Sequence, residues 1–154
     1  MKIEIERAEL SDLETLMQWR ETVLREVFSI PKGEPMEELL AANREYYTHG
    51  LRTGEHIACF AYHGDKIVGC GGVCLYSEMP SPDNPTGKCA YLMNIYTVPA
   101  VRKQGVGETV VRWLSEEAKR CGAGKVYLEA SDVAYPLYRK LGFRDMKGYL
   151  KLDA

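Results

Sequence analysis

Apolar positions recur along the chain with two different periods, one typical of strands and one typical of helices. The order in which these periods occur predicts the order of the structural elements. Residues 2–6 alternate with period two, which is typical of a half-buried strand. Residues 13–27 and 36–50 repeat their apolar positions at helical spacing instead. Two prolines and a glycine in residues 31–35 separate the two predicted helices, because proline lacks an amide donor and glycine permits turns.

The second half of the chain alternates between apolar runs and helical patterns. Two apolar runs are joined at residues 63–66 by a tight turn with glycine and aspartate, which predicts an antiparallel hairpin. The segment 77–88 holds three prolines and is predicted to be a surface loop. The elements expected after it are a strand over 89–98, a helix over 106–118 that ends at Gly122, a strand over 125–130, a short helix over 134–141 and closing strands from Phe143 onward.

This order, roughly β-α-α-β-β-β-α-β-α-β-β, is neither a series of hairpins nor a regular βαβ repeat. It predicts an α+β (α/β) architecture with one mixed, mainly antiparallel twisted sheet of six to seven strands, flanked by about four helices. We find no internal repeat or linker, and we expect residues 1–154 to form a single domain.

Composition narrows the choice of partners. The formal charge of −2 gives no support to nucleic-acid binding or to a polybasic membrane surface, and no apolar run approaches the roughly 18 residues of a membrane span. The five cysteines are odd in number and follow no paired metal spacing, and no secretory leader precedes the first predicted strand. We therefore expect small core cysteines, no metal site and a cytoplasmic location.

A glycine turn at the start of the predicted helix 106–118 carries the first chemical signal. The first turn of a helix exposes unpaired amides and the positive end of the helix dipole, so it attracts phosphate. Gly105 and Gly107 allow an anion to approach the main chain, and Arg102 and Lys103 add positive charge beside them. The spacing fits neither a phosphate-binding Walker loop nor a dinucleotide fingerprint.

Two segments together carry a family resemblance. "TVPAVRKQGVGETVVRWL" contains an R-x-x-G-x-G pattern, and "VYLEASDVAYPLYRKLGF" contains A-x-x-L-Y-x-K-x-G-F. Over residues 89 to 143 the chain closely resembles the GNAT superfamily of acyl-CoA N-acyltransferases, and before that the likeness lies in the order of elements. The resemblance implies a GNAT-like fold and acetyl-CoA as cosubstrate.

The resemblance also implies how acetyl-CoA is held. A bulged strand that parts from its parallel neighbour offers main-chain groups to the pantetheine arm and the thioester, and the amides of the glycine turn receive the diphosphate. Serine at position 131 departs from the asparagine often found there, but it can still bind a pantetheine amide. The implied cosubstrate residues are Ile95, Tyr96, Thr97, Arg102, Lys103, Gln104, Gly105, Val106, Gly107, Glu108, Thr109 and Ser131.

Tyr138 matches the tyrosine that similar enzymes place beside the departing sulfur, where a phenol can protonate the thiolate. The alternative is a core tyrosine on the helix face. Glu129 and Asn94 are polar residues within apolar strands, so Glu129 is a candidate general base and Asn94 a candidate for orienting the acceptor. Glu129 can equally pair with a surface lysine. The three histidines have no spaced partner and are expected at the surface or in turns.

These observations predict an N-acetyltransferase that moves an acetyl group from acetyl-CoA to a primary amine by direct attack on the thioester. One alternative is a non-catalytic acyl-CoA binding or sensing module, and another is a protein or peptide N-acetyltransferase. Acidic residues in the segments expected near the acceptor favour a small cationic amine, although solvated loop charges explain them as well. These residues are Glu34, Glu37, Glu38, Glu78 and Asp83. Exposed strand ends are compatible with a homodimer.

Overall fold

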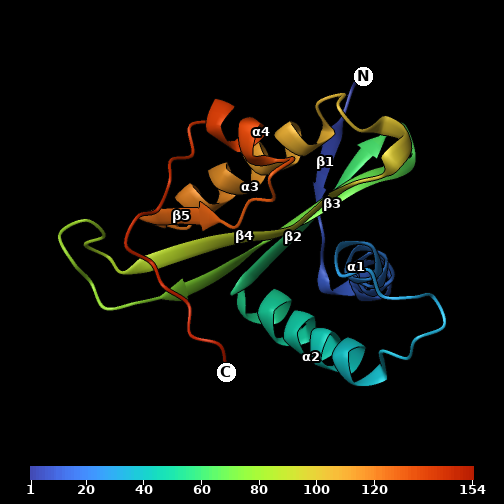
Figure 1. Cartoon of the computed structure of the whole chain (residues 1–154), viewed down its shortest axis with the longest axis horizontal. Coiled ribbons are helices and arrows are strands. Elements are labelled where there is room, and N and C mark those ends of the chain that lie inside the picture. Colours follow the sequence, from blue (N-terminus) through green and yellow to red (C-terminus); the bar gives the residue numbers. More distant parts are fainter.

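The protein is described by a computed structural model that covers all residues 1–154, and its centre is one twisted five-stranded sheet (Figure 1). The strands are β1 (Glu4–Arg7), β2 (His56–His63), β3 (Lys66–Ser77), β4 (Lys88–Thr97) and β5 (Lys125–Leu128). They lie side by side in chain order, and every neighbouring pair is antiparallel except β4 and β5, which are parallel. The mixed, mainly antiparallel sheet predicted from the sequence is therefore confirmed.

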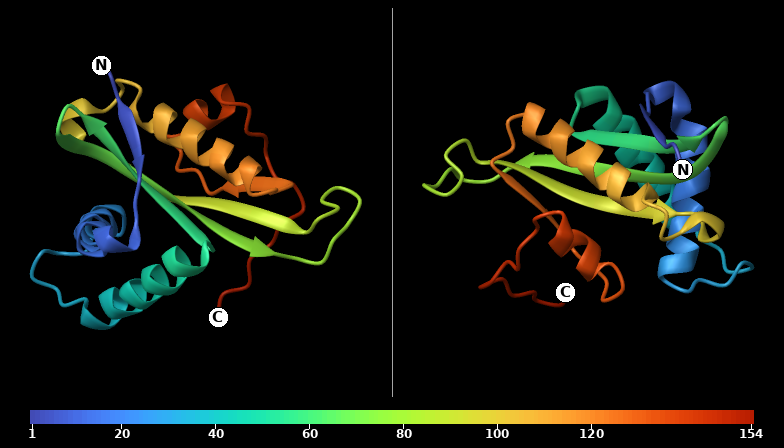
Figure 2. Two further views of the ribbon diagram at one scale, coloured as in Figure 1. Left: turned by 180° about the vertical axis from the view of Figure 1, so that it is seen from behind. Right: turned by 90° about the horizontal axis from the view of Figure 1, so that it is seen from above.

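Four helices cover the two faces of this sheet (Figure 2). The helices α1 (Leu13–Val27) and α2 (Glu37–Thr53) lie on one face, and α3 (Val106–Arg120) and α4 (Tyr135–Lys140) lie on the other. Short 3-10 turns at Leu10–Asp12 and Pro99–Val101 lead into α1 and toward α3.

Alternation of side chains along the strands gives the molecule two apolar cores. Ile57, Cys59 and Val73 point to the α3 face, where α3 contributes buried valines and a leucine at helical spacing. Ala58 and Phe60, which alternate with Ile57 and Cys59 along β2, point to the α1 and α2 face.

The prediction of six to seven strands is wrong in number, because the expected closing strands do not form. Residues 144–154 contain no helix or strand, and Leu150 and Leu152 are 99% and 93% exposed. Gly148 has a φ of +89°, which turns the chain away from an extended path. Among the apolar side chains from residue 143 onward, Phe143 alone packs against the core, next to Tyr138.

The second predicted helix also ends later than expected. Gly50 is buried within α2 and does not terminate it, and the left-handed residue that closes the helix is Gly54, with a φ of +82°. A Cβ atom at position 50 would lie 2.7 Å from the Cβ of His56, so glycine is needed there to let β2 approach the helix. A sequence pattern cannot distinguish a glycine that ends a helix from one that admits a neighbour.

The five cysteines are all free thiols. Cys59, Cys70 and Cys89 are buried as expected, Cys74 is half-buried, and Cys121 is exposed, contrary to the expectation of a core residue. None of the helices combines the length and the apolar character that a membrane crossing requires.

Candidate active site

A bulge in β4 marks the centre of the candidate site. Gly72 pairs with Met93 and Cys70 pairs with Tyr96, so β4 has one residue more than β3 over this stretch. Asn94 lies within the bulge with a φ of +59°, a left-handed conformation that asparagine tolerates better than most residues. The bulge bends the strand and directs the Asn94 side chain toward α1 and α2, as its contact with Tyr47 shows.

Beyond the bulge, β4 has no neighbour on its β5 side. The parallel ladder between the two strands ends at the pair Leu92 and Leu128, and β5 ends there, while β4 continues to Thr97. The main-chain groups of residues 95–97 that face β5 consequently have no strand partner. The ladder thus ends where the resemblance implies that the two strands part, and we call this end of the ladder the wedge between β4 and β5.

The turn before α3 presents an unbroken run of free amides. Arg102 donates its amide to Pro99 O, and the next main-chain donor in a hydrogen bond is Thr109, which donates to Gly105 O at 3.1 Å. The amides of residues 103–108 make no hydrogen bond within the chain. Lys103 and Gly105 both have positive φ values, of +64° and +89°. Such consecutive amides at a helix start form a concave surface that suits an anion.

The two glycines of the turn differ in their surroundings. A Cβ atom at Gly105 would have no neighbour within 4 Å, so the main chain there is open to a ligand. A Cβ atom at Gly107 would lie 3.7 Å from Leu137 Cδ2 and 3.8 Å from Thr97 Oγ1. The start of α3, the end of β4 and the helix α4 therefore meet over Gly107.

The charged side chains around the turn are mostly engaged with other protein groups. The Arg102 guanidinium donates to Thr97 O and to Glu26, both at 2.8 Å, and it lies over the Tyr96 ring. It thus fixes the turn to α1 and to the end of β4 rather than extending freely as the sequence suggested. Lys103 has no ion pair and is the cation left to face a ligand.

Two further side chains predicted to lie at the turn are also held within the protein. Glu108 forms ion pairs with Lys140 at 3.0 Å and Arg112 at 3.3 Å, which lower the pKa of its carboxyl and balance its charge. The Thr109 hydroxyl donates to Gly105 O at 2.8 Å. Both contacts stabilise the first turn of α3.

Tyr138 projects from α4 into the core on the α3 face, and it is only 8% exposed. Its ring packs edge-to-face on Phe143, with centroids 5.9 Å apart. Burial raises the pKa of its phenol, so the hydroxyl stays protonated at neutral pH. That hydroxyl makes no hydrogen bond within the chain, although buried tyrosines usually find a partner, so it is available to a ligand.

Glu129 and Ser131 follow the end of β5. Glu129 is exposed and lies close enough to Tyr91 that, together with burial of Tyr91 as the larger cause, its charge raises the pKa of that phenol to about 12. The Ser131 hydroxyl accepts a hydrogen bond from the amide of Ala134 at 3.3 Å and so shapes the turn into α4. Tyr91 pairs across the sheet with Cys74, which accepts a hydrogen bond from Tyr46 of α2. Through Tyr91, Glu129 thus lies toward the α1 and α2 side of the sheet.

Sequence reasoning missed the polar cluster that surrounds Asn94. Arg20 in α1 donates to both Asn94 and Asn43, and Asn43 belongs to α2. Only Asn94, the polar residue in an apolar strand, gave a signal in the sequence, because its hydrogen-bond partners Arg20 and Tyr47 lie 74 and 47 positions away along the chain.

His56 corrects the expectation of surface histidines. It is 4% exposed, it hydrogen-bonds Tyr46 through Nδ1 at 2.8 Å, and it packs edge-on against Tyr47. Burial first, and the positive charge of Arg20 second, lower the pKa of His56 to about 4, so the ring is neutral at pH 7. His49 and His63 are exposed as expected.

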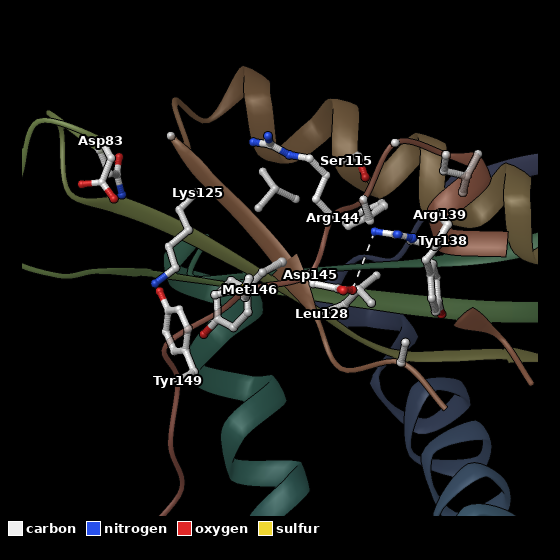
Figure 3. A pocket seen from close by; sticks show the side chains of 18 of the residues that line it. Asp83, Ser115, Lys125, Leu128, Tyr138, Arg139, Arg144, Asp145, Met146 and Tyr149 are labelled. Atoms are coloured by element: carbon white, nitrogen blue, oxygen red, sulfur yellow. Dashed lines mark ion pairs between the residues drawn. The ribbon is translucent and has the colours of Figure 1, made fainter. Parts of the chain in front are cut away.

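A cavity of about 920 Å³ lies elsewhere, along the free edge of β5 between α3, α4 and the C-terminal segment (Figure 3). Of the predicted site residues, Tyr138 alone lines it. Figure 3 shows the ion pair of Arg139 with Asp145 and the side chain of Lys125 beside Tyr149 on its walls. None of the predicted residues of the bulge or of the α3 turn lines this cavity, so the bulge and the turn define the candidate site more directly.

The arrangement of bulge, parted strands and free amides can be compared with known proteins. A model of the acetyltransferase (GNAT) family matches residues 13–143. The chain belongs to this family. The match extends the resemblance from its expected range of residues 89–143 to most of the chain, including α1 and α2.

Two curated proteins that are named as N-acetyltransferases are similar to part of the chain. A glucosamine 6-phosphate N-acetyltransferase of Trypanosoma brucei brucei is 27% identical over 88 residues, which are 57% of this chain and 58% of that protein. A thialysine N-epsilon-acetyltransferase of Sus scrofa is 30% identical over 95 residues, 47% of this chain and 56% of that protein. The chain thus matches less than two thirds of the length of either curated relative.

A solved member of the GNAT family is similar over nearly the whole chain. The crystal structure of a predicted acetyltransferase with acetyl-CoA from Clostridium acetobutylicum has a TM-score of 0.85 and 25% sequence identity, and it covers 99% of this chain and 96% of that one. The five strands and four helices described above are therefore arranged as in a known GNAT structure.

Proposed function

We propose that the protein is an N-acetyltransferase that transfers an acetyl group from acetyl-CoA to a primary amine by direct attack of the amine on the thioester. The observation that carries the proposal is the run of free amides at residues 103–108, placed next to the wedge between β4 and β5. Family membership, the solved relative with acetyl-CoA and the two curated relatives named as N-acetyltransferases support it.

The residues around the turn fit the cosubstrate. The amides of residues 104–108 would receive the diphosphate, because no side chain covers Gly105 and no protein acceptor uses these donors. Lys103 supplies the unpaired positive charge, and Arg102 and Thr109 hold the turn in shape. The unpaired main-chain groups of Ile95, Tyr96 and Thr97 would hold the pantetheine arm, with Ser131 on the opposite wall.

Tyr138 is the proposed general acid. Attack on the thioester breaks the carbon–sulfur bond and leaves a thiolate, which is a poorer leaving group when nothing protonates it. A phenol that is buried, protonated and without a protein partner suits this role, and α4 lies beside the α3 turn, where a Cβ atom at Gly107 would be 3.7 Å from Leu137 Cδ2. Glu129 is the proposed base for the incoming ammonium group, and Asn94 lines the acceptor side of the bulge.

The first experiment measures binding. Acetyl-CoA, ATP and NAD are compared for their effect on thermal unfolding, since a ligand at 100 times its dissociation constant stabilises the folded state by about 2.7 kcal/mol. We expect stabilisation by acetyl-CoA and weaker effects from ATP and NAD.

Gly105→Ala should reduce the stabilisation by acetyl-CoA. The matched control is Gly64→Ala, because Gly64 has a φ of +63° and equally open surroundings but lies in the hairpin between β2 and β3. Equal effects of the two variants on acetyl-CoA binding would contradict the proposed phosphate site.

The second experiment measures turnover. Tyr138→Phe should lower kcat by about 10²- to 10⁴-fold, with acetyl-CoA binding unchanged, because only the proton donor is removed. Tyr62→Phe is the control, since the Tyr62 hydroxyl also makes no hydrogen bond in the chain but lies on the opposite face of the sheet. Normal turnover by Tyr138→Phe would exclude this tyrosine as the acid. If no amine in a broad panel causes release of free thiol from acetyl-CoA, the result argues against the proposed activity as a whole.

A further inference from the structure

Arg20 differs from every other arginine of the chain in combining partial burial with the lack of a counter-ion. Six of the ten arginines pair with a carboxylate within 4 Å, including the half-buried Arg25. Three more, Arg7, Arg52 and Arg144, have no ion pair but are exposed to water. Arg20 alone is partly buried and has no carboxylate within 4 Å. A cation removed from water without a counter-ion costs free energy, so its retention calls for an explanation.

The surroundings hold the Arg20 guanidinium in a fixed direction without neutralising it. Nε donates to Asn43 Oδ1 at 2.8 Å, and Nη1 donates to Asn94 Oδ1 at 2.9 Å. Both acceptors are neutral amides, and each is oriented in turn: Asn43 Nδ2 donates to Leu39 O, and Asn94 Nδ2 donates to the Tyr47 hydroxyl. The remaining nitrogen, Nη2, makes no hydrogen bond within the chain and is not sealed from solvent.

The titratable groups packed around Arg20 do not supply a negative charge. Its positive charge acts on Tyr47 from α2, on His56 from β2, and on Cys70 and Cys74 from β3. Burial raises the pKa of Tyr47 and of Cys70 to about 12 each, and it raises the pKa of Cys74 as well, so these groups are neutral at pH 7. These neighbouring groups therefore leave the positive charge of Arg20 uncompensated.

The acidic residues that favoured a cationic acceptor do not neutralise Arg20. Glu78 pairs with Lys125 at 3.4 Å, and Asp83 accepts from Ser81 at 2.6 Å in the loop between β3 and β4. Glu37 lines the groove between α1 and α2 together with Arg44. None of the five forms a hydrogen bond or ion pair with Arg20, Asn43 or Asn94.

We propose that Arg20 binds an anionic group of the acceptor, a carboxylate or a phosphate, and so selects amines that carry such a group. The inference rests on the proposed acetyl transfer and names the acceptor class for it. Arg20 donates a hydrogen bond to the bulge residue Asn94. The main chain of Asn94 leads into the segment 95–97, which is proposed to hold the thioester. A planar guanidinium with one edge fixed and one nitrogen free presents a directed donor to an oxyanion.

The test uses matched pairs of amine acceptors that differ in the anion alone. One pair is an amino acid and its carboxamide, and the other is an amino sugar and its phosphate ester. A hydrogen bond to a charged group discriminates by about 10- to 100-fold, so we expect kcat/KM to favour the anionic member of one pair by that factor. The pair that shows the preference distinguishes carboxylate from phosphate.

Two variants separate anion binding from a structural role. Arg20→Gln should abolish the preference by raising KM for the anionic acceptor far more than KM for its uncharged counterpart. Arg20→Lys should show part of the preference that Arg20→Gln loses, because lysine keeps the positive charge but lacks the planar donors of the guanidinium. Arg44→Gln is the control: Arg44 also connects α1 with α2, through Glu14, but it lies away from the bulge, so the preference should persist.

The outcomes distinguish this inference from the proposed function. Wild-type protein that acetylates both members of each pair equally well, or an Arg20→Gln variant that keeps the preference, overturns the role of Arg20 and leaves acetyl transfer intact. Thermal stabilisation by the same compounds provides a readout without turnover. If no amine is acetylated, anionic members that stabilise wild-type protein more than Arg20→Gln still support the subsite, and equal effects on both proteins reject it.

Discussion

His56 makes the stability of this protein depend on pH over a range that can be calculated. An unfolded histidine titrates near 6.5, whereas burial and the charge of Arg20 lower the pKa of His56 to about 4 in the folded protein. The unfolded chain therefore binds one more proton between these two values. The stability contributed by neutral His56 is fully present above pH 6.5 and is lost as the pH falls toward 4.

The magnitude follows from the difference between the two pKa values. Each pKa unit corresponds to about 1.4 kcal/mol, so the full loss is about 3 kcal/mol, of which about 2 kcal/mol falls between pH 7 and pH 5. A loss of 2 kcal/mol is a large part of the stability of a small domain. The window down to pH 5 lies above the usual titration range of carboxylates, so His56 dominates it.

The assay is denaturant unfolding at pH 7, 6 and 5 for wild-type protein, His56→Gln and His49→Gln. His56→Gln should be less stable at pH 7, since it loses the packing and the bond to Tyr46, but its stability should change little with pH. His49→Gln should retain the wild-type slope, because His49 is exposed. The reasoning fails if His56→Gln retains the slope as well, or if wild-type stability is flat between pH 7 and pH 5.

Three further predictions concern the sheet and the bulge. Gly71→Ala should destabilise the fold by about 1–3 kcal/mol in denaturant unfolding, because the new Cβ atom would lie 2.6 Å from Val110 Cγ1; an unchanged midpoint would refute tight packing there. Asn94→Ala should cost about 2 kcal/mol and Asn94→Gly about half as much, since both lose the bond to Arg20 but only alanine adds left-handed strain; equal losses would argue against the strain. Glu129→Gln should lower the pKa of Tyr91 from about 12, followed by its ultraviolet titration, and should reduce kcat if Glu129 is the base; an unchanged Tyr91 titration would place the two side chains apart.

The features that the sequence predicted correctly depend on neighbours along the chain. The glycine turn is an example, because a strand end, two glycines and the first helical turn lie within a few residues. Its free amides follow from helix geometry alone. The parallel pairing of β4 with β5 was also predictable, since a strand, a helix and a strand in succession favour it.

The features that the sequence did not reveal depend on contacts between distant segments. The Arg20, Asn43 and Asn94 cluster joins three elements, and nothing near Arg20 in the sequence indicates that it lacks a counter-ion. The engagement of Arg102 by Glu26 is another such contact, and it changes the expected task of that arginine. The missing closing strands have the same origin, because alternation at the C-terminus cannot show whether a partner edge is present.

The separation of the two cores by the sheet has a consequence for how such a protein can diversify. The amides proposed to grip the cosubstrate belong to the α3 face, whereas Arg20 and Asn43 belong to helices on the other side. On the proposed roles, substitutions around Arg20 and Asn43 can therefore alter acceptor choice without touching the turn, which contacts α1 at Glu26 instead. A change in acceptor specificity therefore requires no change in the proposed acetyl-CoA site.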